Sequence, residues 1–320
     1  MIPVCFMGFY IFTYCCIAMF ILATARLIYR QITMPLHLRW EIYPVQHEPT
    51  DKLVHGGSYM EDLNWWEKKH GSSLFNGLKY MAPEILLLRG LWKENRRLWW
   101  VSFPFHFGLY LMIATFALLI LHALLVLGGG EAYVAGGVIG ALLGGLIVLT
   151  GWTGLMLGVV GSFGTLFRRL ADPALRAYSS FSDYFNILLV SFFFLSAFIT
   201  CLFVDPLLIG AKAYVFGLLT GGRSLNAYAP SASIFGGAAI ILASVLAAYV
   251  PLTHMSHMFM KFFFYHKIKW DDAPNLRGGG IEDDILKNLR LKPTWNAKHI
   301  AANGRKSWAD LASSAPKETK

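Results

Sequence analysis

The chain has 320 residues, of which 56% are hydrophobic and 15% are charged, and its mean hydropathy is +0.49. Soluble domains of this size rarely have this composition, so the sequence predicts a polytopic membrane protein. The formal net charge of +9 lies between and after the apolar runs, where it sets membrane topology rather than binding nucleic acid. All four cysteines lie in apolar runs without a CxxC or CxxCH motif, which argues against an iron–sulfur cluster in this chain and against c-type haem.

The first apolar run, Val4–Ile28, lacks the basic start and the small-residue cleavage site of a signal peptide. We therefore expect a retained transmembrane helix within residues 1–30. Residues 31–98 are too polar to span a bilayer, yet they contain several tryptophans and the apolar run Ala82–Leu91. This pattern is typical of one or two helices that lie at the membrane interface.

Four further apolar runs predict the remaining spans, in a transmembrane haem-binding core of residues 99–266. A tight turn at Gly128–Gly130 follows the second span, and the glycines of the third favour close packing of helices or of a flat cofactor. We expect Leu207–Leu219, which is short and interrupted by glycines, to be an external connector. Residues 267–320 form a polar tail with at most one helix, Ile281–Leu289. The four runs are Trp99–Leu127, Ala132–Phe163, Tyr184–Val204 and Ser231–Phe264.

The positions of Lys and Arg predict the orientation. Eleven lie in the segment 26–97 and twelve from Lys261 onward, whereas the turn at Gly128–Glu131 has none. Short loops rich in Lys and Arg stay on the cytoplasmic side of the membrane. The expected fold is therefore an all-α membrane protein, a five-transmembrane-helix bundle with the N-terminus outside, the C-terminus inside, and a cytoplasmic interfacial loop and tail.

Histidines within the apolar runs are candidate functional residues, because an ionisable side chain at membrane depth is costly to bury. His106 and His122 lie in the second span, and His254 and His257 lie in the fifth. The second and fifth spans run antiparallel, so His106 can meet His254 or His257 at a similar depth. A pair of imidazoles on facing helices is a common way to hold b-type haem. Ser102, Thr253 and Ser256 could supply hydrogen bonds that orient such a ligand.

His122 follows His106 by sixteen residues, which is about 24 Å along a helix and about 160° around it. It therefore lies near the outer side, on nearly the opposite face. Three interpretations stay open: a second haem ligand, a proton acceptor for a quinol, and a structural histidine. For the second, neutral imidazole suits proton transfer near neutral pH, and Glu131 could relay the proton outward. That interpretation predicts a quinone pocket between the second and third spans.

Two segments, MPLHLRWEIYPVQHE and THMSHMFMKFFFYHKIKWDD, resemble the cytochrome b subunits of the Dsr, Tmc and Hmc type transmembrane redox complexes of sulfate-reducing bacteria. The five-helix plan and the first helix ending in ARLIYRQ resemble the gamma subunit of respiratory nitrate reductase. This resemblance covers roughly residues 5–275. It implies a multi-pass subunit in a bacterial or archaeal cytoplasmic (inner) membrane. Such a subunit carries electrons between menaquinol or menaquinone and a cytoplasmic iron–sulfur (heterodisulfide reductase-like) subunit of a larger complex.

In the gamma subunit, two histidines on each of the second and fifth helices hold two haems. The resemblance matches His106 and His122 on the second span, and His257 or His254 at the cytoplasmic ligand position of the fifth. The outer ligand position of the fifth span falls on small apolar residues. We therefore expect one haem b, with His106 and His257 on its iron, or two haems if His122 is also a ligand.

The basic and aromatic stretches Arg39–Tyr43 and Trp270–Trp308 are candidates for docking the iron–sulfur partner, because aromatic anchors are typical of interface cores. The simpler alternative is that they set topology and anchor the chain at the interface. Two rival functions differ in class from a cytochrome: a haem-free membrane anchor for a catalytic subunit, and a transporter. The absence of an obvious internal repeat argues against the transporter.

Overall fold

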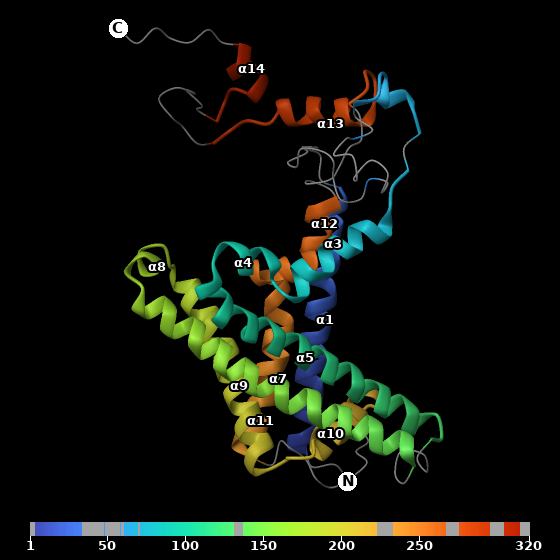
Figure 1. Cartoon of the computed structure of the whole chain (residues 1–320), viewed down its shortest axis with the longest axis vertical. Helices are drawn as coiled ribbons and strands as arrows, with labels where there is room; N and C mark the ends of the chain where they lie inside the picture. Colours follow the sequence, from blue (N-terminus) through green and yellow to red (C-terminus); the bar gives the residue numbers. More distant parts are fainter. Residues whose placement is uncertain are drawn as a thin grey trace. The chain divides into compact units, whose positions relative to one another are not determined.

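A computed structural model describes the chain at residues 4–33, 48, 58, 61–69, 71–130, 137–222, 233–266, 275–294 and 304–313. These residues form helices, turns and irregular segments, with no strand among them (Figure 1). Five helical segments are long and apolar enough to cross a membrane, which confirms the prediction of an all-helical, multi-pass membrane protein. They are α1 (Val4–Ile32), α5 (Arg96–Leu127), α7 (Val138–Ala171), α9 (Phe181–Phe203), and α11 (Ile234–Tyr249) with the 3-10 turn η4 (Val250–Leu252).

The chain divides into two compact units. The first consists of Met1–Thr24 and Met81–Ser256, and it contains α5, α7, α9 and α11. The second consists of Ala25–Tyr80 and His257–Lys320. Each unit therefore combines two separate stretches of the chain. The chain passes from one unit to the other within α1, between Tyr80 and Met81, and between Ser256 and His257.

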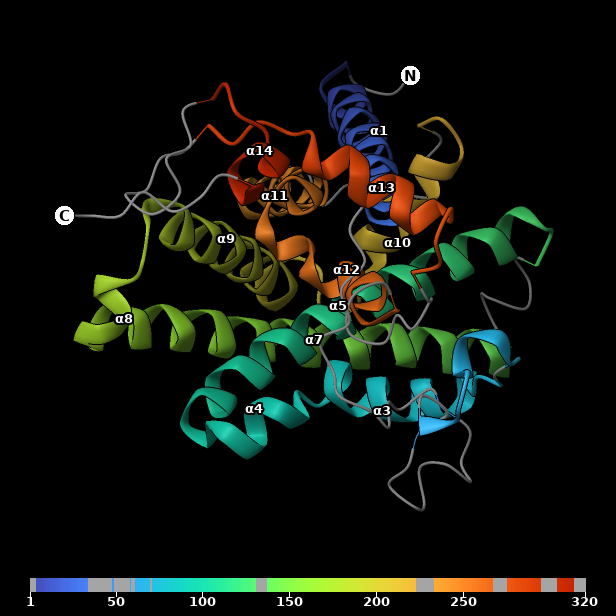
Figure 2. The same cartoon turned by 90° about the horizontal axis from the view of Figure 1, so that it is seen from above.

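Helices α5 and α7 have the most extensive contact of any helix pair in the first unit, and α9 packs on both α7 and α11 (Figure 2). Small residues make the first contact close. A Cβ atom on Gly108 would lie 2.6 Å from the backbone nitrogen of Gly158, and one on Gly154 would lie 3.0 Å from the Cβ of Leu111. A Cβ on Gly158 would also overlap the ring of Phe194. At these positions the glycines serve close helix packing.

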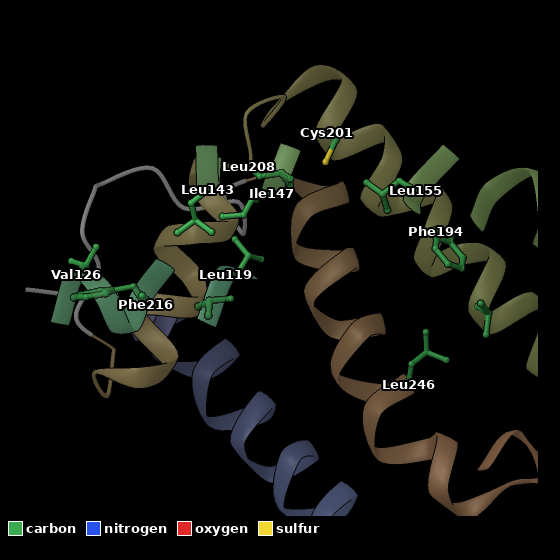
Figure 3. Close-up of a cluster of buried hydrophobic side chains, with 13 residues drawn as sticks. Leu119, Val126, Leu143, Ile147, Leu155, Phe194, Cys201, Leu208, Phe216 and Leu246 are labelled. Carbon is green, nitrogen blue, oxygen red and sulfur yellow. The ribbon is translucent and has the colours of Figure 1, made fainter. Parts of the chain in front are cut away.

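The segment expected to be an external connector is instead a packed helix, α10 (Ile209–Leu219), which contacts α5. Val215 and Phe216 of α10 are buried in the same cluster of apolar side chains as Leu119 of α5 (Figure 3). The prediction of a connector was wrong because it gave the shortness and glycine content of the segment more weight than its hydropathy. Nearly every residue of this segment is apolar, and apolar side chains gain stability when they leave water or pack closely.

A strained turn positions α10 at the end of α9. Leu208 has a φ of 54°, in the left-handed region that a branched side chain rarely adopts. Its side chain lies against Gly151 of α7, where no Cβ could be accommodated. The indole nitrogen of Trp152 donates a hydrogen bond to the carbonyl oxygen of Pro206 at 2.9 Å. These two contacts from α7 hold the turn, and hence the start of α10, against the bundle.

The sequence predicted one continuous helix through the fifth apolar segment to Phe264. The structure instead shows a helix that is interrupted. Helix α11 ends at Tyr249, and Pro251 follows in a 3-10 turn. Proline lacks the amide hydrogen that the next turn of an α-helix would need, and its ring crowds the preceding turn. The elements after this break are η4, η5 (His254–Ser256) and α12 (His257–Phe264).

The loop and the tail contain short helices. The apolar run Ala82–Leu91 lies mainly in two of these helices, α3 (Leu74–Leu86) and α4 (Arg89–Glu94), as predicted.

The tail contains the expected helix, α13 (Gly280–Leu289), and a second helix, α14 (Trp308–Ser313). The prediction of at most one helix in the tail was therefore wrong. The missed pattern was Ser307 followed by Asp310, whose carboxylate accepts hydrogen bonds from the Ser307 backbone and hydroxyl, which lower the pKa of Asp310. The remaining helices are η2 (Trp65–Glu67), α3 (Leu74–Leu86), α4 (Arg89–Glu94), α8 (Pro173–Ala177), α13 (Gly280–Leu289) and α14 (Trp308–Ser313).

Candidate functional site

His106 lies on α5, half-buried, and its ring is fixed by the preceding turn of the same helix. Its Nδ1 atom is 2.7 Å from the carbonyl oxygen of Ser102, and the Ser102 hydroxyl is 3.3 Å from the same nitrogen. A carbonyl oxygen can only accept, so Nδ1 carries the proton and donates it. The lone pair of the ring is then on Nε2. Histidines that bind metals are commonly oriented by a hydrogen bond of this kind.

The two histidines expected in the fifth span lie on different elements. His254 is in the 3-10 turn η5 and is exposed, and it interacts electrostatically with Asp183 at the start of α9. His257 is the first residue of α12 and belongs to the second unit. Both candidate partners of His106 therefore lie after the break at Pro251, and of the two only His254 shares the compact unit of His106.

Asp183 is itself held in place. Its carboxylate accepts hydrogen bonds from the Ser180 backbone nitrogen at 2.9 Å and from the Ser180 hydroxyl at 2.8 Å, and Arg169 of α7 lies 3.7 Å away. This capping box starts α9 and fixes the carboxylate that faces His254. A second contact joins the same end of the bundle, where the Tyr249 hydroxyl donates to the Asn186 side chain at 2.8 Å.

A haem iron takes only two axial nitrogens from the protein, so its fit depends on how single histidines are presented. Among the described residues there is no group of three or more His, Cys, Asp or Glu side chains that could hold a metal ion. The orientation of His106, with a carbonyl on Nδ1 and a lone pair on Nε2, fits one axial ligand of a haem.

His122 lies on the same helix and is only 9% exposed. Its Nδ1 atom is fully buried and has no hydrogen-bond partner among the described residues. A buried polar atom without a partner costs about 1–3 kcal/mol, so such an atom suggests a group that pairs with it in the cell. Glu131, the other candidate for a quinone site, is outside the described residues.

Two charged residues that the sequence analysis did not single out are linked to His122, Lys212 directly and Asp205 through Lys212. Lys212 of α10 is half-buried and interacts electrostatically with both His122 and Asp205. Asp205 is 4% exposed, and its carboxylate accepts a hydrogen bond from the backbone nitrogen of Ala211 at 3.0 Å. We call these three residues, His122, Lys212 and Asp205, the His122 cluster.

The His122 cluster is assembled by the packing of α10. The lysine amine approaches α7 as well, because a Cβ atom on Gly144 would lie 3.6 Å from the Nζ of Lys212. The sequence analysis does not single out Lys212, because it interprets the segment Leu207–Leu219 as a connector. The sequence did carry a useful pattern, since Lys212 is the single charged residue in the apolar segment 207–222.

Comparisons of the chain with protein-family models, with curated proteins and with solved structures found no match. The fold and its hydropathy therefore define the class of this protein, an all-helical membrane protein with five candidate spans.

Proposed function

We propose that this protein is a b-type cytochrome subunit of a respiratory membrane complex. It carries electrons between menaquinol or menaquinone and a cytoplasmic iron–sulfur partner of the heterodisulfide reductase-like kind. The observation that carries the proposal is His106, a half-buried imidazole on a membrane-spanning helix whose Nδ1 is engaged by the Ser102 carbonyl. A histidine held in this tautomer is prepared to bind a metal through Nε2.

In this proposal the haem supplies a one-electron carrier within the bundle. His106 holds it from α5, and the Ser102 hydrogen bond fixes the plane of the ring and increases the basicity of the coordinating nitrogen. The sequence analysis gives His257, or alternatively His254, as the residue that would supply the second imidazole, and of these His254 lies in the same compact unit as His106. The N-terminus lies outside and the C-terminus inside, which puts the basic loop and tail on the side of the partner.

The proposal assigns His122 to a quinone site on the outer half of the membrane. Its unpaired, buried Nδ1 can form a hydrogen bond with a quinone or quinol oxygen, which supports this assignment. The alternative is that His122 is a ligand of a second haem. A His122→Gln variant separates the two, because it keeps all haem in the first case and loses one haem in the second.

Replacing His106 by Ala tests the proposal. We expect the His106→Ala variant to lose one haem per chain, because the iron loses an axial nitrogen, measured as haem per purified protein. His266→Ala is the matched control, since the His266 Nδ1 also contacts a carbonyl one turn earlier, that of Phe262, at 2.9 Å. The control should keep its haem. Full haem content in both variants would contradict the role of His106.

A further inference from the structure

The His122 cluster contains a half-buried cation, Lys212, whose amine lies against helix α7. Lys212 is half-buried, it makes no ion pair or hydrogen bond with any described residue, and its amine lies beside α7 at Gly144. An ammonium group with three donors and no close acceptor has capacity to bind a ligand oxygen. The electrostatic interaction with Asp205 offsets part of the cost of holding this charge away from water.

His122 is the second, independent observation at the same place. It is nine-tenths buried, its Nδ1 has no hydrogen-bond partner in the part of the chain that the structure describes, and the charge of Lys212 acts on its ring. Two polar groups on two helices, α5 and α10, thus have unused hydrogen-bonding capacity near each other. Beside the lysine amine α7 presents the small residue Gly144, where a Cβ atom would lie 3.6 Å from Nζ.

We propose that Lys212 is a substrate-binding residue that donates a hydrogen bond to an oxygen of a quinone headgroup, while His122 engages the same headgroup. The inference rests on the proposed function and adds a residue to it. A quinone headgroup is flat, has oxygens that accept hydrogen bonds, and reaches the site from the bilayer. A charged donor is worth more than a neutral one when the oxygen gains negative charge, as it does when a quinol loses its proton.

A quinol that becomes a quinone loses two electrons and two protons. The electrons would pass one at a time to the haem that His106 would hold and from there to the iron–sulfur partner, which would accept both, and the protons would leave to water. Lys212 is neither oxidised nor reduced, and its role is to hold the headgroup and to stabilise the oxygen that becomes electron-rich.

The test compares full-length Lys212→Met with Lys212→Arg in detergent. Met keeps the length and removes the charge and the donors, whereas Arg keeps both. Lys93→Met is the control, because Lys93 is an exposed lysine of α4. Binding of the fluorescent quinol analogue heptyl-hydroxyquinoline N-oxide is titrated for each protein, and the haem reduction rate with menadiol is measured separately.

We expect Lys212→Met to bind the analogue about tenfold more weakly, the size expected for a lost hydrogen bond to a charged group. Lys212→Arg and Lys93→Met should bind as the wild type does. Equal binding by Lys212→Met and the wild type would overturn the inference and leave the proposed function standing. A wild-type protein without haem would overturn the proposed function, whatever the binding result. If Lys212→Met fails to fold, Lys212→Arg decides: binding equal to that of Lys93→Met supports the inference, and weaker binding by a folded Lys212→Arg decides against it.

Discussion

At the scale of single residues, buried polar groups in this bundle are of two kinds. One kind is fully paired: the Thr13 hydroxyl of α1 is 2.7 Å from the Tyr214 hydroxyl of α10 and 2.8 Å from the Ser244 hydroxyl of α11. The Tyr214 hydroxyl also lies 3.3 Å from the carbonyl oxygen of Phe9. The other kind, represented by the His122 Nδ1 atom, has no hydrogen-bond partner among the described residues. We assign a structural role to the Thr13 group and propose a binding role for His122.

The paired group predicts a loss of stability on removal of one hydroxyl. Tyr214→Phe removes the contacts to Thr13 and Phe9, and we expect it to lower the free energy of unfolding by about 1–3 kcal/mol. Unfolding with increasing SDS in mixed micelles measures the change. Tyr178→Phe is the control, since Tyr178 is 90% exposed. If the two variants are equally stable, these hydroxyls do not join α1 to α10 and α11.

Residue chemistry also shows what of the site was predictable. His106 and its Ser102 partner followed from the sequence, because the two residues are one helical turn apart and both lie in an apolar run. Lys212 did not, because its proximity to His122 depends on how α10 folds back onto α5. Contacts between segments that are distant along the chain are set by packing and cannot be derived from local spacing.

At the scale of elements, α7 shows how small residues determine helix packing. Gly108 and Gly158 allow the backbones of α5 and α7 to touch, and Gly158 also receives the Phe194 ring from α9. Gly145, on the same helix, has no neighbour within 4 Å of a Cβ position. Gly158 and Gly145 thus lie on the same helix, but only Gly158 is in close contact with a neighbouring helix.

This difference predicts opposite effects for the same substitution. Gly158→Ala should destabilise the protein by about 1–3 kcal/mol, because the added methyl overlaps the Phe194 ring. Gly145→Ala should be neutral, or stabilising by up to about 1 kcal/mol through helix propensity. The thermal unfolding midpoint in detergent distinguishes the two. Similar midpoints for both variants would contradict the α5–α7 and α7–α9 packing.

Most elements were predictable because long apolar runs have few alternatives in a membrane. The runs predicted the ends of α1, α5 and α9 to within four residues, whereas α7 extends eight residues beyond the predicted end at Phe163. The break after Tyr249 was not predicted, although Pro251 was visible, since proline can kink a membrane helix or end it, depending on its surroundings. Local sequence thus determined where helices form, and the surrounding packing determined where they stop.

At the scale of the whole molecule, the central claim is that an all-helical membrane bundle carries electrons through haem. Five apolar helical segments supply the membrane part, and His106 and His122 place imidazoles within one of them. The proposed docking stretches Arg39–Tyr43 and much of Trp270–Trp308 are outside the described residues. The claim therefore stands on the histidines of the bundle.

The most direct measurement of this claim is a reduced-minus-oxidised optical spectrum of the purified full-length protein. Two imidazoles on one iron make a low-spin haem, so we predict a b-type alpha band after reduction with dithionite. Menadiol should produce the same band, because the proposed electron donor is a quinol. A well-folded protein with no alpha band would contradict the account and favour a haem-free anchor or a transporter.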